Sequence, residues 1–268
     1  MIANVPMIDM KRKYRYSILT YNFGGYEIMR EILHPKDDVE YIYVTDDRNL
    51  TSTTWKIVID ESLDGLSPFD KCYSVRFNPF KYVSSDICIR VDGSIVVDGN
   101  ADKLIEEFEK GNYDMACVAH RFRDNMIDEY NAWIRLREYP QQQAEKCLSY
   151  IERNGYSLDT KGMFECYLCV QRRNEICEEI NKKTFEVLKE LGDGEKIERQ
   201  DQTIFTFVVY NWFRDKVSVL PLSALVVHSS MFKICLHNKK DSIIYDMLNP
   251  NLYEGYFMNR MTKFLVLG

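Results

Sequence analysis

Apolar and polar positions along the chain follow two alternating patterns, one typical of buried strands and the other of amphipathic helices. Strand-like runs include RYSILTY (15–21), VEYIYVT (39–45) and WKIVID (55–60). Between such runs, apolar residues recur at intervals of three or four, which places them on one face of a helix. This alternation favours a largely parallel sheet flanked by helices, so we predict an α/β fold.

Turn and capping residues locate the helices of the first half. After the first strand, the turn Asn22–Gly25 leads into an expected helix that Pro35 helps to end, with an apolar face of Ile28, Met29, Ile32 and Leu33. Ser67 and Pro68 are an N-cap and first-turn pair for a further helix, which Pro79 should end.

The segment DICIRVDGSIVV, residues 86–97, is predicted as one strongly apolar strand with Asp92 in its middle. A carboxylate among Ile and Val must be paired, hydrogen-bonded or bound to a cation, because its desolvation is costly. Arg90, on the same strand face, is one candidate partner. Gly93, in contrast, permits the close approach of a ligand or of another backbone.

The β-α-β rhythm continues to about residue 120 and then changes. The expected elements are a helix capped by Asn100, a strand at 113–120, helices at 125–139 and 141–154, a strand at 163–173, and helices at 174–191 and 201–213. The segment 201–213 also has the β-branched and aromatic content of a strand, but the helical spacing of its apolar residues favours a helix. Without a linker or repeat, residues 1–268 are treated as one domain, with a nucleotide-binding half (15–120) and an acceptor-side half (121–268).

Charge and apolar run length restrict the partners. The chain has 35 Lys and Arg against 41 Asp and Glu, a net charge of −6, so no broad positive field is available for nucleic acid. No apolar run is long enough for a transmembrane segment or a secretory signal, and we expect a cytoplasmic protein. The basic run 11–15 is either a solvated arm or a peripheral contact with the inner face of a membrane.

Eight cysteines are present, most of them within apolar runs, and they are expected to be buried free thiols. Cys166 and Cys169 have the C-x-x-C spacing, but no second pair completes a tetrahedral zinc site.

Polar residues that follow the first strands are candidate ligand contacts, because α/β sheets bind ligands at the carboxyl ends of their strands. Aromatic and amide groups can hold a base, and a carboxylate can accept the hydroxyl hydrogens of a ribose. The candidates are Tyr21, Asn22, Asp46 and Asp47. The alternative for Asn22 and Asp47 is that they only form turns.

The segment SVRFNPFKYVSSDICIRVDGSIVV (74–97) resembles GT-A nucleotide-sugar glycosyltransferases, especially those of family eight, in which an arginine helix leads to a strand bearing D-x-D. The resemblance implies a GT-A fold with a mixed, mainly parallel sheet. It also implies that Arg76 contacts the nucleotide sugar and that Asp92–Ser94 lies at the diphosphate. The D-G-S-I form further resembles a glycosyltransferase-like branch from bacterial polysaccharide clusters and plant Golgi proteins.

Two later segments extend the resemblance. In ERQDQTIF, Asp201 and Gln202 match an Asp-Gln pair that faces the sugar in family-eight enzymes, with Asp201 as an ordinary N-cap the alternative. In LSALVVHSSMF, His228 matches a metal-binding histidine after the last core strand, and Lys233 lies near a lysine of the family motif.

The resemblance therefore implies Mn²⁺ or Mg²⁺ bound by Asp92 and His228. Ser94 replaces the second carboxylate of D-x-D and removes one anionic ligand, so Arg76 and a C-terminal lysine are the alternative source of positive charge. The expected function is transfer of a sugar from a nucleotide-diphosphate donor, with UDP the expected nucleotide, to a saccharide or lipid-linked acceptor in polysaccharide synthesis. A catalytically silent nucleotide-sugar-binding protein and a nucleotidyltransferase are the alternatives.

Overall fold

The computed structural model describes residues 14–97, 101–120, 123–136, 140–192, 200–220, 232–235 and 244–246. A seven-stranded sheet has the strand order β3-β2-β1-β4-β7-β6-β8, and a three-stranded sheet has the order β10-β9-β5. The strands are β1 Tyr16–Asn22, β2 Val39–Thr45, β3 Lys56–Ile59, β4 Ile87–Val91, β5 Ile95–Val97, β6 Met115–Ala119, β7 Phe164–Arg172, β8 Val217–Leu220, β9 Phe232–Cys235 and β10 Ile244–Asp246.

Strand direction confirms the predicted class. The β1–β2, β2–β3, β1–β4 and β6–β8 pairs are parallel, whereas β7 is antiparallel to both of its neighbours, β4 and β6. The sheet is therefore mixed and mainly parallel, and helices flank it, as the alternation of segments predicts.

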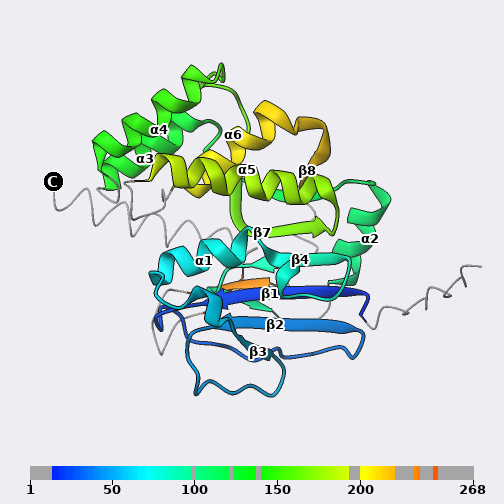
Figure 1. Cartoon of the computed structure of the whole chain (residues 1–268). Helices are drawn as coiled ribbons and strands as arrows, with labels where there is room; N and C mark the ends of the chain where they lie inside the picture. Colours follow the sequence, from blue (N-terminus) through cyan, green and yellow to red (C-terminus); the bar gives the residue numbers. More distant parts are fainter. Residues whose placement is uncertain are drawn as a thin grey trace, which may run out of the picture.

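The α-helices are α1 Pro68–Arg76, α2 Asp102–Lys110, α3 Met126–Leu136, α4 Gln141–Arg153, α5 Glu175–Leu191 and α6 Asp201–Trp212. Figure 1 shows α3, α4, α5 and α6 gathered on the side of the sheet that contains β7 and β8, away from β2 and β3. A hydrophobic cluster with residues from α1, α3, α4, α5 and α6 packs these helices together. No helix in the described part of the chain is long and apolar enough to cross a membrane.

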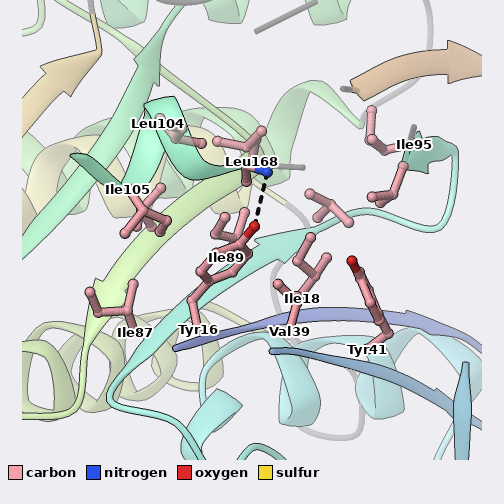
Figure 2. Packing of buried hydrophobic residues seen from close by; sticks show 14 of the residues in the cluster. Tyr16, Ile18, Val39, Tyr41, Ile87, Ile89, Ile95, Leu104, Ile105 and Leu168 are labelled. Atoms are coloured by element: carbon pink, nitrogen blue, oxygen red, sulfur yellow. Dashed lines mark hydrogen bonds between the residues drawn. The ribbon is translucent and has the colours of Figure 1, made fainter. Parts of the chain in front are cut away.

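The main core lies on the sheet face that α2 covers. All seven residues of β1 and all seven of β2 are buried, as expected for strands with near-continuous apolar character. Figure 2 shows Leu104 and Ile105 of α2 packed near Ile87 and Ile89 of β4. The buried hydroxyl of Tyr16 accepts a hydrogen bond from the Ala101 backbone N–H at 3.0 Å, so its polar end is satisfied in this apolar layer.

Capping residues explain where the confirmed helices begin. The Ser67 side chain accepts from the backbone N–H of Asp70 at the start of α1, and that of Asn174 accepts from the N–H of Cys177 at the start of α5. The segment 201–212 is a helix, α6, as its spacing predicts. The proposed cap Asn100 and the apolar run before His228 lie outside the described residues.

The helix predicted after β1 is wrong. Residues 23–38 form turns and irregular backbone. Of the expected apolar face, Ile32 is buried in the main core and Met29 packs against it, whereas Ile28 and Leu33 are 40% and 59% exposed. The Asn22 side chain accepts from the Glu27 N–H at 3.0 Å and donates to the Glu27 carbonyl at 2.7 Å. These bonds close a turn in which Gly24 has a φ of +67°, a conformation that a helix cannot use.

The single strand predicted over 86–97 is also wrong, because a turn divides it into β4 and β5. The Ile95 N–H donates to the Asp92 carbonyl at 2.9 Å across this turn. A Cβ on Gly93 would lie 2.9 Å from the Tyr21 carbonyl oxygen, so only glycine fits against the end of β1. Asp92 therefore lies just after a strand rather than inside one, and the expected close approach at Gly93 is made by another backbone.

Candidate active site

The candidate site lies where the connections of the sheet change direction. From β1 the chain continues to β2 and β3 on one side, whereas β4 pairs with the other side of β1. Open α/β sheets bind ligands at such a point, outside the carboxyl ends of the strands. Tyr21 and Asn22 end β1, and Asp92 follows β4, so three of the predicted residues meet at this edge.

Arg76, the last residue of α1, joins three separate parts of the chain. Its Nε donates to the Tyr21 hydroxyl at 2.7 Å, and its Nη2 donates to Asp92 Oδ1 at 2.6 Å. Its Nη1 donates to Oδ2 of Asp201, the first residue of α6, which is 125 positions further along the chain. The fork-like guanidinium suits this role because its N–H groups point in fixed, different directions.

Tyr21 and Arg90 complete the group, which we call the Arg76 cluster: Tyr21, Arg76, Arg90, Asp92 and Asp201. The Tyr21 hydroxyl donates to Asp92 Oδ1 at 3.1 Å, and Arg90 Nη1 lies 3.6 Å from the same oxygen. Burial, above all, raises the pKa of Tyr21 well above its usual value, so the phenol stays protonated and can donate.

A distortion of β7 supplies a further acceptor. Residues 166–168 are skipped in the pairing of β7 with β6, and the Cys166 carbonyl accepts from Arg90 Nη1 at 2.9 Å. Irregular pairing of this kind re-aims backbone groups and is common beside active sites. The sequence analysis gives Arg90 only as a partner for Asp92. It could not predict the contact with the Cys166 carbonyl, because a backbone oxygen is the same for every residue type.

The charges of the cluster balance, and its carboxylates reach solvent. The Asp92 and Asp201 side chains are 29% and 15% exposed, and that of Arg76 is 11% exposed. Burial by itself would lower the pKa of Arg76, but the adjacent Asp92 carboxylate and neighbouring groups such as Tyr21 together outweigh this effect and hold that pKa well above its usual value. Arg76 is therefore a permanent cation between two carboxylates.

One buried donor in the cluster lacks an acceptor. Arg90 Nε has no hydrogen-bond partner among the described residues, although the Arg90 side chain is only 5% exposed. A buried guanidinium N–H without an acceptor is costly, and such groups are uncommon in folded proteins. The Arg76 cluster thus has a buried hydrogen-bond donor for which the described residues supply no acceptor.

Asp46, predicted to contact a ribose, forms a second ion pair with α1. Lys71 Nζ lies 2.9 Å from Asp46 Oδ2, and the Gly24 N–H donates to Oδ1 at 3.0 Å. Burial opposes ionisation, but these donors outweigh it and lower the pKa of Asp46. Lys71 was missed by the sequence analysis, although it precedes Arg76 on the same predicted helix.

The remaining predicted residues are placed less specifically. Asp47 Oδ1 accepts from the Asn49 N–H at 2.9 Å, and Asn22 is bonded to Glu27, so both side chains form turns in this structure. Gln202 follows Asp201 in α6, and Ser94 lies in the turn after β4. Lys233 is opposite Val96 in the pairing of β9 with β5, and His228 lies outside the described residues.

The described surroundings of Asp92 do not fit a divalent cation. Ca²⁺ takes six to eight oxygen ligands, whereas Mg²⁺ is usually held by one or two carboxylates together with waters and substrate phosphates. The described residues contain no group of three acidic, histidine or cysteine side chains suited to a metal. Asp92 Oδ1 already faces Arg76 and Arg90, and both positive charges oppose a further cation. The predicted Asp92–His228 pair stays untested.

Comparisons with known proteins found similar folds at low sequence identity. Mouse xyloside xylosyltransferase 1 in its apo form has a TM-score of 0.44 and 10% identity, over 78% of this chain and 86% of that chain. The glycosyltransferase GlyE of Streptococcus pneumoniae has a TM-score of 0.41 and 14% identity, over 77% of this chain and 45% of that chain.

The galactosyltransferase LgtC in complex with donor and acceptor sugar analogs has a TM-score of 0.41 and 12% identity, over 76% of this chain and 72% of that chain. No protein-family profile matches the sequence. A search of curated proteins finds no sequence match.

Proposed function

We propose that the chain is a glycosyltransferase that uses a nucleotide-diphosphate sugar as donor. The observation that carries this proposal is that Arg76 binds both Asp92 and Asp201. The resemblance assigns Arg76 to the nucleotide sugar, Asp92 to the diphosphate and Asp201 to the sugar. The three residues come from distant segments of the chain. They meet at the carboxyl ends of β1 and β4, the part of an open α/β sheet where ligands bind, which supports the proposal.

The chemistry asked of the site is the exchange of one C–O bond for another. The bond from the anomeric carbon to the diphosphate breaks, and the electron pair leaves with the diphosphate. An acceptor hydroxyl oxygen forms the new bond, and the hydroxyl proton is released to solvent. Positive charge near the diphosphate lets it leave without a proton. Asp201 and Gln202, at the start of α6, are proposed to face the sugar and stabilise positive charge at the anomeric carbon.

The finer assignments follow the resemblance. UDP is the proposed nucleotide, and the acceptor is a saccharide or a lipid-linked saccharide in polysaccharide synthesis. The predicted stacking of a base on Tyr21 does not fit this structure, because the Tyr21 ring is buried in the core and only its hydroxyl reaches the Arg76 cluster. The helices α3 and α4, from the acceptor-side half, are proposed to select the acceptor. Retention of anomeric configuration follows from the family-eight resemblance.

A catalytically silent nucleotide-sugar-binding protein is the second candidate. It is favoured by the fact that Asp92 and Asp201 are both hydrogen-bonded to Arg76 in this structure. An enzyme needs at least one of these carboxylates to contact the sugar. The nucleotidyltransferase alternative has no comparable support, because the glycine turn NFGGYE lacks the lysine that would cradle a triphosphate.

Two measurements test the proposal. Thermal unfolding is followed with UDP, GDP and ADP, since a ligand that binds the folded state raises Tm. A panel of UDP-sugars is then tested for release of UDP, with and without Mn²⁺. Stabilisation by a nucleotide diphosphate together with release of UDP supports the enzyme. Stabilisation without release supports the silent binder, and the lack of both contradicts the proposed function.

A further inference from the structure

We infer that Arg76 and Arg90 bind the diphosphate oxygens directly and that no divalent cation binds at Asp92. This inference rests on the proposed function, because it concerns how the same site holds its donor. It departs from the metal that the resemblance implies. Of the two sources of positive charge that the sequence leaves open, it takes Arg76, with Arg90 in place of the C-terminal lysine.

The first argument is the charge already present around Asp92. Arg76 Nη2 lies 2.6 Å and Arg90 Nη1 lies 3.6 Å from Asp92 Oδ1, and the Tyr21 hydroxyl donates to the same atom. That oxygen has no capacity left for a metal. A cation bound to Oδ2 would lie close to both guanidinium groups, and their like charges would repel it.

The second argument is which polar groups remain unused. Arg90 Nε is a buried donor without a partner, and the three bonds of Arg76 use three of its five N–H groups. Unused buried donors call for an acceptor. The oxygens of a diphosphate are strong, charged acceptors, and arginine binds them well because of its planar fork.

The third argument is the place of the carboxylates. Each of Asp92 and Asp201 gives one oxygen to Arg76, and no described residue donates to Asp92 Oδ2 or Asp201 Oδ1. These two oxygens are suited to accept hydrogens from sugar hydroxyls. The carboxylates then recognise the sugar, whereas the guanidinium groups recognise the diphosphate, and neither task needs a metal.

The first test uses the metal without nucleotide. Free Mn²⁺ is titrated with the full chain and followed by electron paramagnetic resonance. The variants are Asp92→Asn and, as a matched control, Asp64→Asn, which removes an exposed carboxylate paired with Arg48. We expect the same Mn²⁺ binding in all three proteins. One Mn²⁺ per chain that is lost in Asp92→Asn and kept in Asp64→Asn would overturn the inference.

The second test measures the Kd of UDP by calorimetry, in EDTA and in Mn²⁺. We expect the two values to agree within about twofold. Arg76→Lys and Arg90→Lys should each weaken UDP binding by about tenfold, or about 1.4 kcal/mol, because lysine keeps the charge but not the fork. Circular dichroism checks that each variant folds.

The outcomes separate the two proposals. A Kd that rises tenfold or more in EDTA would refute the inference and leave the proposed function standing. No binding of UDP in either buffer would refute the proposed function, and the Mn²⁺ titration would still decide whether Asp92 binds a cation.

Discussion

Two carboxylates at the same edge of the sheet form two kinds of ion pair. We call a pair closed when all its polar atoms have partners nearby, and open when it shares its cation with a distant residue and lies beside an unpaired donor. Asp46 follows β2 and Asp92 follows β4, and each is paired with a cation of α1, Lys71 or Arg76. The Asp46 pair is completed nearby by the Gly24 N–H, and Lys71 also lies 5.8 Å from the centre of the Phe23 ring. The Asp92 pair reaches across the molecule to α6.

This difference separates structural from functional roles. Both oxygens of Asp46 have donors, so the Asp46 pair is complete without a ligand. The Asp92 pair shares its cation with Asp201, and the adjacent Arg90 has a buried donor without an acceptor. A group of charges that leaves costly polar atoms unsatisfied is better explained by a ligand than by stability.

The first experiment replaces Asp with Asn at each of the two positions, 92 and 46, and compares the two variants. Asp92→Asn should lower the release of UDP from a UDP-sugar by roughly 100- to 1000-fold, the size of effect seen when one preorganised polar group is removed from a reacting centre. Asn is nearly isosteric and keeps an oxygen for Arg76, so the fold should survive. The measurement is the initial rate of UDP release at saturating donor.

Asp46→Asn is the control for this experiment, and its rate should stay within about threefold of wild type. Equal losses in the two variants would show that the closed and open pairs do not differ in function. A selective rise in the donor KM of Asp46→Asn would retain Asp46 as the ribose contact that the sequence predicts.

Arg76 should carry the largest stability effect in the cluster. Arg76→Met removes the cation between two partly buried carboxylates, and we expect the free energy of unfolding to fall by roughly 3 kcal/mol. Urea unfolding followed by circular dichroism measures this change. Lys71→Met, which leaves one carboxylate with a backbone donor, is the matched variant and should cost less. A greater loss in Lys71→Met would reverse the ranking of the two pairs.

The sequence predicts the elements that rest on local signals. The Ser67–Pro68 pair places α1, helical spacing places α5, and apolar runs place β1 and β2, because these features depend on residues close in sequence. The helix expected after β1 does not form, because local spacing alone does not decide whether a segment packs as a helix. Its spacing is helical, but only part of the expected face is buried: Ile32 lies in the core, whereas Ile28 and Leu33 stay exposed. The Asn22–Glu27 bonds stabilise a turn at its start.

The site is predicted by the resemblance rather than by local patterns. Nothing in the periodicity near Arg76 or Asp201 indicates that they meet, because the contact depends on how α1 and α6 pack. The turn at Asp92–Ser94 divides the predicted strand, yet it is this turn that brings Asp92 to the edge of the sheet. The Cys166 carbonyl, a backbone atom at an irregular pairing, is beyond any inference from residue type.

Asp201 provides an intermediate test, because it shares Arg76 with Asp92 but starts a different helix. Asp201→Asn should lower kcat by roughly 10- to 100-fold and leave the Kd of UDP nearly unchanged, since Asp201 is proposed to face the sugar rather than the nucleotide. Steady-state rates and UDP calorimetry give the two values. An unchanged kcat with weaker UDP binding would move Asp201 to the nucleotide side.

The smallest expected effect is the contribution of Asp46 to stability, and it has a definite pH dependence. Because Lys71 and Gly24 lower the pKa of Asp46 in the folded state, ionised Asp46 stabilises the fold above its unfolded pKa of about 4. That contribution is lost as the pH falls through the lower folded-state pKa. Asp46→Asn should therefore cost about 1 kcal/mol at pH 7, with the difference from wild type shrinking below pH 4. Urea unfolding at a series of pH values measures this difference, and a constant gap down to pH 2 would mean that packing, not charge, accounts for the loss.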